Sequence, residues 1–270
     1  MVHVNQLAGE REIWPVTRTL ACSEVWGCTC KVVHSVELPG LRGWIYAAPI
    51  EFGESGGDIH YLSVCDHGSL SRLALADVSG HGRAVSTVAE RLLGLMRRHI
   101  SSVEQPEFLC ELSRSLQDGN VAGGRTFATG LLMGFDSSTG QLVFTNAGHP
   151  LPLWYQAREK RWGWLQETTS DATLAWVGLP LGLGLATSYV DTVVKLGVGD
   201  LLICYTDGIS EATDDTGREL GADGLLEVAR TLPVGSPMAA GAMLLGRVGA
   251  FRRGAPALDD ETLIVLQRSS

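Results

Sequence analysis

The sequence predicts an α+β fold in which antiparallel strands form the core and the helices are grouped in pairs. Strand-like runs come two at a time around short turns, and the stretches with helical spacing fall into two pairs, within 83–118 and 221–250. A parallel α/β fold would instead alternate strands and helices along the chain. The 270 residues contain no internal repeat, low-complexity tract or linker, so we expect one main domain at 36–270. Residues 1–35 are expected to form an N-terminal extension or an edge element.

The composition excludes some classes of protein. The chain is 45% hydrophobic and 19% charged, which is ordinary for a globular domain. Its net charge of -9 argues against nucleic acid as a partner, because a face that binds phosphates must be basic. No apolar run approaches the roughly 20 residues of a membrane span, and the N-terminus has no apolar signal core. We therefore expect a cytoplasmic protein that binds neither membranes nor nucleic acids.

The first part of the core is predicted to contain a strand, a loop and a hairpin. Residues 43–51 form a strand-like run, and the glycine-rich stretch 51–57 indicates a loop. Two further strand-like runs, at 59–65 and 71–78, flank the short sequence DHGS. Two strands joined by so short a turn are typical of a hairpin.

The rest of the chain continues with helices and further hairpins. Apolar residues recur at helical spacing over 83–100, and 104–117 predicts a second helix with Pro106 in its first turn. The later elements are expected in this order: hairpins at 126–148 and 151–167, strands at 187–196 and 199–207, helices at 221–232 and 236–250, and a last strand at 261–267. The tryptophans of the second of these hairpins are expected to pack against neighbours rather than to bind a ligand.

The six cysteines suit a reducing compartment if their thiols are free. Three lie inside strand or helix patterns and are expected to be small core residues: Cys65, Cys110 and Cys204. Cys22, Cys28, Cys30 and His34 carry the ligand types that zinc prefers, although they lack paired C-x-x-C spacing. Because the residues from Cys28 onward alternate as in a strand, a structural role is the preferred interpretation and a zinc site the alternative.

Two aspartates are expected to face each other at the end of the first hairpin. If the turn is centred between His67 and Gly68, Asp58 lies directly opposite Asp77. Directly opposed residues have Cβ atoms about 5 Å apart, where like charges are destabilising. Two carboxylates held in this way need a proton or a cation. The glycines at 56, 57 and 80 would let an ion and the backbone approach closely.

A second set of carboxylates has the same character. Asp207 ends an apolar strand and is followed by Gly208, and Asp259 and Asp260 immediately precede the last strand. Carboxylates at strand ends beside small residues suit the oxygen-seeking ions Mg²⁺ and Mn²⁺. Each aspartate alone could instead be a solvated residue at a turn boundary. Four at corresponding places in one chain favour a metal site.

Five motifs resemble a known family. SGGD, LADVSGHG, TNAGHPLPL, LLICYTDGISEA and DDETLIV occur in the order found in the metal-dependent protein phosphatases (PPM). The sequence is most similar to the bacterial branch that includes stage II sporulation protein E and the phosphatases that regulate sigma factors. This resemblance covers roughly residues 40 to 268. It implies that 36–270 is a PPM-type phosphatase domain, a central antiparallel β-sandwich flanked by helix pairs in α-β-β-α layers.

The resemblance also implies a site with two Mn²⁺ or Mg²⁺ ions. Its expected metal ligands are Asp58, Asp77, the backbone carbonyl of Val78, Asp207 and Asp259. Asp260, Gly57 and Gly208 are expected to support these ligands. A hydroxide held by the two metals would attack a phosphoserine or phosphothreonine ester, so no side-chain nucleophile is required.

The sequence departs from the family pattern at some positions. Animal-type relatives have a histidine, a proposed general acid, where this chain has Ser79, so His81 is the candidate for a catalytic acid. Arg42 and Arg83 are the candidates for the phosphate-binding arginine of those relatives. His149, in NAGHP, is expected to be a structural turn residue near the rim of the site.

The resemblance points to a phosphatase that acts on a phosphorylated regulatory protein, such as an anti-sigma-factor antagonist. Residues 83–118 match the regulatory helix pair of relatives, and a separate sensor or regulator protein would supply the input. Two alternatives stay open at this point. One is a non-catalytic binding module with a phosphatase fold, and the other is a hydrolase of small phosphate esters.

Overall fold

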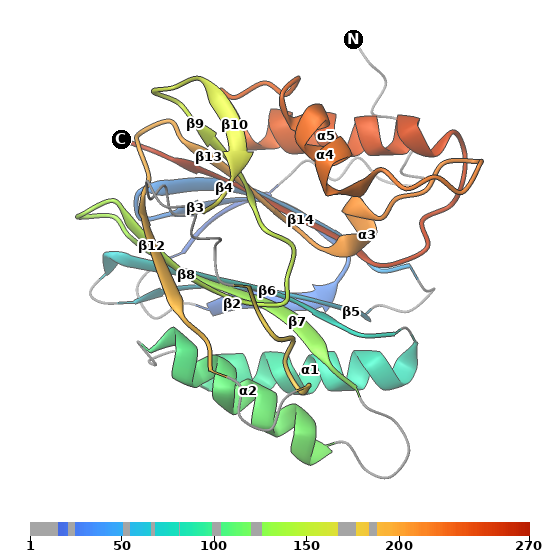
Figure 1. The fold of residues 1–270 in the computed structure, drawn as a ribbon. Coiled ribbons are helices and arrows are strands. Elements are labelled where there is room, and N and C mark those ends of the chain that lie inside the picture. Colours follow the sequence, from blue (N-terminus) through green and yellow to red (C-terminus); the bar gives the residue numbers. More distant parts are fainter. Residues whose placement is uncertain are drawn as a thin grey trace.

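The computed structural model shows two β-sheets packed face to face between two layers of helices (Figure 1). It describes residues 16–20, 25–50, 55–65, 68–80, 82–98, 104–119, 126–166, 177–183 and 188–270. The predicted α+β sandwich with α-β-β-α layers is therefore confirmed.

One sheet has seven strands in the order β1-β3-β4-β14-β13-β9-β10. Its strands are β1 (Val16–Thr19), β3 (Val32–Leu38), β4 (Leu41–Ala48), β9 (Leu153–Gln156), β10 (Arg161–Trp164), β13 (Leu201–Tyr205) and β14 (Glu261–Arg268). The pairing is antiparallel except at one edge, where β1 runs parallel to β3. The last strand of the chain thus lies in the middle of this sheet, beside β4.

The other sheet follows the order β11-β8-β7-β6-β5-β2, and β12 also pairs with β8. Its strands are β2 (Val25–Cys30), β5 (Ser55–Cys65), β6 (Leu70–Val78), β7 (Ala128–Asp136), β8 (Gln141–Ala147), β11 (Val177–Gly178) and β12 (Asp191–Lys195). Both predicted hairpins of this sheet are present, as β5–β6 and β7–β8. The parallel contact between β11 and β8 lies at its edge.

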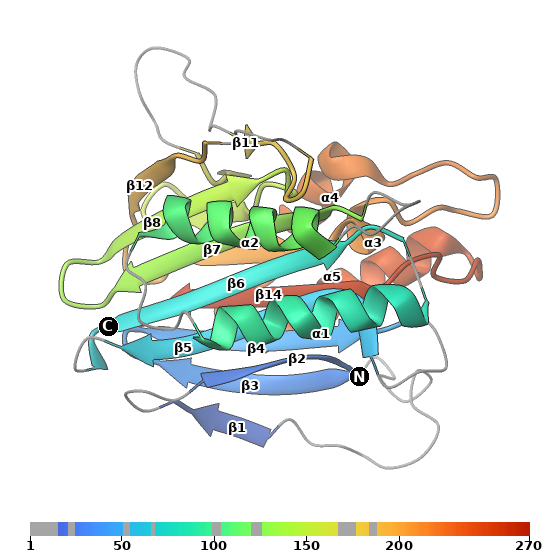
Figure 2. The same ribbon diagram turned by 90° about the horizontal axis from the view of Figure 1, so that it is seen from below.

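Helices cover the outer face of each sheet. The pair α1 (Arg83–Arg98) and α2 (Gln105–Gly119) lies across the second sheet, as the view from below shows (Figure 2). The pair α4 (Gly221–Ala229) and α5 (Pro237–Arg252) covers the first sheet, and the short α3 (Asp207–Ser210) follows β13. None of the described helices combines the length and the hydropathy needed to cross a bilayer.

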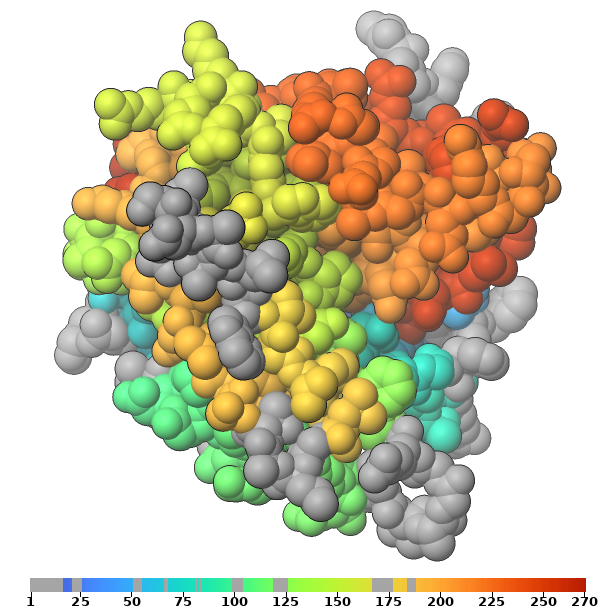
Figure 3. Space-filling model, viewed as in Figure 1, coloured from blue at the N-terminus to red at the C-terminus, as the bar shows by residue number. Residues whose placement is uncertain are grey.

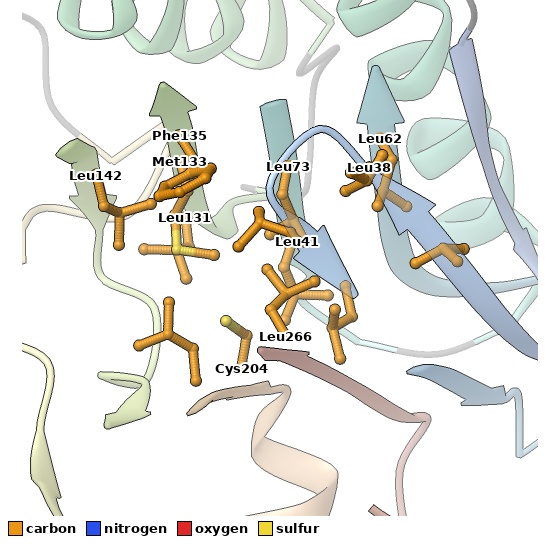
Figure 4. Packing of buried hydrophobic residues seen from close by; sticks show 14 of the residues in the cluster. Leu38, Leu41, Leu62, Leu73, Leu131, Met133, Phe135, Leu142, Cys204 and Leu266 are labelled. Atoms are coloured by element: carbon orange, nitrogen blue, oxygen red, sulfur yellow. The ribbon is translucent and has the colours of Figure 1, made fainter. Parts of the chain in front are cut away.

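Alternation along the strands divides each sheet into an inner and an outer face. Alternate residues such as Leu62, Leu73 and Leu131 pack between the sheets, together with Cys204 and Leu266 from the opposite sheet (Figure 4). The residues between them on the same strands pack beneath α1 and α2. Because the period is two, Asp58 shares the inner face with Leu62, and Asp77 shares it with Leu73.

The structure corrects several details of the predicted elements. Gly56 and Gly57 lie inside β5 rather than in a loop, and Asp207 begins α3 instead of only ending a strand. The expected boundary at residue 35 falls inside β3, while β1 and β2 lie at the edges of the two sheets. The expectation of six reduced cysteines is wrong in the structure, because Cys28 and Cys30 form a disulfide.

Candidate active site

The two aspartates of the first hairpin meet as the sequence predicts. Asp58 of β5 lies opposite Asp77 of β6, and the whole hairpin keeps this register as far as Cys65 and Leu70. The pair lies at the end of the sandwich where α1 begins. On the same face of the molecule, cyan atoms from the β6–α1 segment meet orange atoms from the segment that follows β13 (Figure 3).

Asp58 is buried between the sheets and anchored to the opposite one. Its Oδ2 accepts a hydrogen bond of 2.8 Å from the Thr206 hydroxyl, which lies at the end of β13. The same hydroxyl oxygen accepts the backbone N–H of Thr262 at 2.9 Å. Burial and the neighbouring charge of Asp77 raise the pKa of Asp58 well above its usual value, against the smaller lowering effect of the two threonines. Neither threonine was expected from the sequence, although a hydroxyl beside each aspartate motif was a usable signal.

Asp77 has several acidic neighbours. Burial, followed by the charges of Asp207, Asp259, Asp260 and Glu211, raises its pKa to about 8. These acids come from two segments of the chain, α3 with the residue after it and the pair before β14, and Asp77 lies on a third. The shift therefore shows that the carboxylates of the two predicted sets converge on one place.

Asp207 and Asp259 lie across from the Asp58–Asp77 pair. Asp207 is the first residue of α3, and burial followed by the charge of Asp259 raises its pKa. Asp259 is exposed, and its Oδ1 accepts the backbone N–H of Asp260 at 2.8 Å. Glu211, which the sequence analysis missed, lies one turn beyond Asp207, and burial and the Asp207 charge raise its pKa.

Asp260 holds the backbone on both sides of the segment between β4 and β5. Its Oδ1 accepts the N–H of Ile50 at 2.7 Å, and its Oδ2 accepts the N–H of Gly57 at 2.6 Å. The side chain is buried, with 8% of its surface exposed. With its oxygens committed to backbone donors, Asp260 fixes the start of β5 and hence the position of Asp58.

Three glycines leave room for these contacts. A Cβ on Gly57 would lie 3.0 Å from the carbonyl oxygen of Val78 and 3.6 Å from Oδ1 of Asp77. A Cβ on Gly56 would lie 2.3 Å from Oδ2 of Asp260, and one on Gly208 would lie 2.1 Å from the Asp260 carbonyl oxygen. Real Cβ atoms do not approach to 2.1 or 2.3 Å, so a side chain at position 56 or 208 would force Asp260 to shift. Gly57 in particular keeps the Val78 carbonyl beside the carboxylates.

The DVSGHG sequence forms the turn from β6 into α1. Gly80 and Gly82 adopt positive φ angles of 98° and 94°, which favour glycine. The Ser79 hydroxyl accepts the N–H of Phe127 at 3.1 Å, so it anchors the turn to the start of β7. His81, the candidate general acid, lies outside the described residues.

The candidate phosphate-binding arginines do not gain support. Arg42 pairs with Gln267 in the β4–β14 register, whereas Ala48 pairs with Glu261 at the acidic end. Six residues along a strand span about 20 Å, so Arg42 lies at the opposite end of the sheet and the suggestion is wrong. Its Nη2 instead donates to Gln267 Oε1 at 2.8 Å. Arg83 begins α1, and its side chain lies outside the described part of the structure.

His149 is buried next to the acidic cluster. Its Nδ1 lies 2.8 Å from the hydroxyl of Thr129, and Thr129 pairs with Asp77 across β6 and β7. The Asn146 side chain bonds both the N–H and the carbonyl of His149, which fixes the turn. Burial lowers the pKa of His149 to about 3, so the ring is neutral at pH 7. These contacts agree with the structural role that the sequence analysis preferred.

The donor set fits hard divalent cations. Carboxylates and a backbone carbonyl gather here, and the raised pKa values of Asp58, Asp77 and Asp207 reflect a surplus of negative charge. Among the described residues, no three acidic, histidine or cysteine side chains are already grouped closely enough to hold one ion. The folded backbone places these carboxylates near one another. To bind one ion together, their side chains would have to rotate toward it.

Comparison with known proteins gives a family match over most of the chain. The model of the family described as stage II sporulation protein E (SpoIIE) matches residues 68–269. A curated relative, the phosphoserine phosphatase RsbP of Bacillus subtilis, is 24% identical over 164 residues. That alignment covers 59% of this chain and 38% of RsbP, so the chain spans about two fifths of this relative.

Solved structures share the fold. The RsbU and RsbW domains of Rv1364c from Mycobacterium tuberculosis superpose with a TM-score of 0.69 at 24% identity, covering 89% of this chain and 63% of that one. The PP2C phosphatase domain of SpoIIE from Bacillus subtilis, with a fragment of its regulatory domain, gives a TM-score of 0.68 at 17% identity. There the match covers 84% of this chain and 63% of that one.

Proposed function

The chain belongs to the stage II sporulation protein E (SpoIIE) family, and we propose that it is a metal-dependent phosphatase of phosphoserine or phosphothreonine in a regulatory protein. One observation carries the proposal: acids from α3 and the residue after it, and from the segment before β14, raise the pKa of Asp77, which itself lies opposite Asp58 at the end of the β5–β6 hairpin. A purely structural role would not require so much uncompensated negative charge at one point.

The ions would be held by carboxylates from both sheets. We assign Asp58, Asp77, the Val78 carbonyl, Asp207 and Asp259 as ligands of two Mn²⁺ or Mg²⁺ ions. When bound, a pair of divalent cations supplies a nucleophile from water at neutral pH and offsets the charge of the phosphoryl group. No cysteine or serine nucleophile is then needed.

The other residues of the site position these ligands. Thr206 holds Asp58 from the opposite sheet. Asp260 fixes the backbone of Gly57, the residue that precedes Asp58. Glu211, with a raised pKa and an exposed position, can carry a proton near the site. His81 stays the candidate for protonating the leaving alkoxide.

The helix pair 83–118 is the proposed regulatory element, acted on by a separate sensor or regulator protein. Two contacts support a connection to the site. The Ser86 hydroxyl donates to the carbonyl of Ser55, the first residue of β5, at 2.9 Å. A Cβ on Gly57 would lie 2.9 Å from Cγ1 of Val85, so the first turn of α1 packs directly on the strand that carries Asp58. A shift of α1 would therefore move β5.

The names of the relatives support the proposed substrate class. RsbP is named as a phosphoserine phosphatase, and the similar solved structures include the PP2C phosphatase domain of SpoIIE. A phosphoserine on an anti-sigma-factor antagonist or a similar small domain is therefore the proposed substrate.

Phosphate release tests the proposed function. We expect the purified chain with Mn²⁺ to hydrolyse a phosphoserine protein and an aryl phosphate, and EDTA to abolish both activities because the carboxylates alone supply no nucleophile. Release of phosphate from the aryl ester but from no phosphoprotein would favour a hydrolase of small esters. Tight Mn²⁺ binding with no turnover on either substrate would favour a non-catalytic binding module.

A further inference from the structure

A second group of ligand-type side chains lies between the sheets at the β2 edge. Cys28 and Trp26 of β2, His60 of β5 and His34 of β3 come from both sheets. Cys28 pairs with His60 in the β2–β5 register, so their side chains project from the same face. None of these residues belongs to the proposed phosphatase machinery.

The sulfur and the imidazole are already in contact. Sγ of Cys28 lies 3.8 Å from Nε2 of His60. The β2–β5 register shifts between Cys28 and Cys30. The two cysteines, two positions apart, form a disulfide. Their Cα atoms are 5.4 Å apart.

Both histidines are short of polar partners. His60 is almost fully buried, with 1% of its surface exposed, and its Nδ1 has no hydrogen-bond partner. The Nδ1 of His34 is also buried without a partner. The Trp26 ring contacts both histidines, with its centroid 5.3 Å from each imidazole. A buried polar group without a partner is costly, which makes this pair of rings an unexplained feature of the core.

We propose that Cys28, Cys30 and His60 form a binding site for a thiophilic cation of the zinc class when the disulfide is reduced. In tetrahedral zinc sites the Zn–S and Zn–N distances of about 2.3 and 2.0 Å place sulfur and nitrogen roughly 3.5 Å apart. The observed 3.8 Å between Cys28 and His60 is close to that spacing. The oxidised form offers no such site, in line with the absence of a three-ligand group among the described residues.

Reduction of the Cys28–Cys30 disulfide requires an external dithiol. Two electrons and two protons pass from the dithiol to the Cys28–Cys30 disulfide, which yields two thiols and a cyclic disulfide as the oxidised product. Binding of a divalent cation then releases one proton from each thiol. His60 contributes a neutral ring nitrogen, and a water can complete the coordination.

Cobalt absorption separates this site from the acidic one. We expect the full chain, reduced with dithiothreitol and freed of the reductant without air, to show a thiolate-to-cobalt charge-transfer band when Co²⁺ is added. Carboxylates cannot produce that band, so Co²⁺ in the acidic cluster does not interfere. Protein with the intact disulfide should lack the band, and Zn²⁺ should displace it.

Variants assign the ligands. Cys28→Ser and Cys30→Ser should each abolish or strongly reduce the band, and His60→Asn should weaken Co²⁺ binding at least about tenfold. Cys110→Ser, on α2, is the matched control and should leave the band unchanged. Circular dichroism would show whether His60→Asn stays folded, and the two serine variants carry the test if it does not. A reduced wild type without the band, or a band that survives the double Cys28→Ser/Cys30→Ser change, would overturn the proposal.

Discussion

Replacing Asp77 with asparagine is expected to lower the rate of phosphate release at least about a hundredfold. The change preserves the size of the side chain but removes the charge that a divalent cation needs as a ligand. Asp77 is also the point on which the charges of Asp207, Asp259 and Asp260 converge. Initial rates with an aryl phosphate across a range of Mn²⁺ concentrations measure the effect.

A matched variant separates charge loss at the site from a general effect. Asp223 is an exposed residue in the first turn of α4, and Asp223→Asn should retain activity close to that of the wild type. If Asp77→Asn kept more than about a tenth of the wild-type rate at saturating Mn²⁺, Asp77 would not be a metal ligand.

The same substitution is expected to stabilise the protein when divalent ions are removed. The pKa of Asp77 is raised to about 8 by burial and by its acidic neighbours, against an unfolded value near 3.8. The folded state then holds a proton that the unfolded state releases, so the free energy of unfolding falls as pH rises between these values. One such proton corresponds to a slope of about 1.4 kcal/mol per pH unit. Asparagine has no proton to lose, so its slope should be smaller.

Buried histidines act in the opposite sense and define the pH window. Burial lowers the pKa of His60 to about 4 and that of His149 to about 3, so their contributions to stability are lost as pH falls below about 6.5. Above pH 6.5 these contributions are nearly constant. The range from pH 6.5 to 8 therefore reports mainly on the carboxylates.

Urea unfolding in EDTA measures this effect. The wild type should lose stability steadily from pH 6.5 to 8, and Asp77→Asn should lose at least about 1 kcal/mol less over that range. Excess Mn²⁺ should raise the stability of the wild type and flatten its pH dependence, because a cation replaces the proton. If the free energies of unfolding of the two proteins in EDTA changed with pH in parallel, the pKa of Asp77 would not be raised in the folded state.

Local patterns in the sequence predict most of the fold and the central pair of the site. The register of the first hairpin follows from its short turn, and that register by itself places Asp58 opposite Asp77. The alternation of apolar residues then fixes both carboxylates on the inner face. The spacing of the apolar residues also locates both helix pairs to within a few residues.

Contacts between distant segments do not follow from local patterns. The bond from Thr206 to Asp58 joins residues 148 positions apart, and no local period specifies it. Arg42 is a candidate only by its place in the sequence, whereas the β4–β14 register puts it at the far end of the sheet. Reduced cysteines are expected only because a cytoplasmic compartment is inferred, and the bulge that brings Cys28 to Cys30 depends on pairing with β5.

The most direct test of the shared metal centre is an anomalous difference map from crystals of the protein grown with Mn²⁺. We predict two peaks about 3.5–4 Å apart, contacted by Asp58, Asp77, Asp207 and Asp259 with oxygen–metal distances near 2.1 Å. Manganese bound elsewhere, or a map without manganese at these four carboxylates under conditions where the protein releases phosphate, would contradict this prediction.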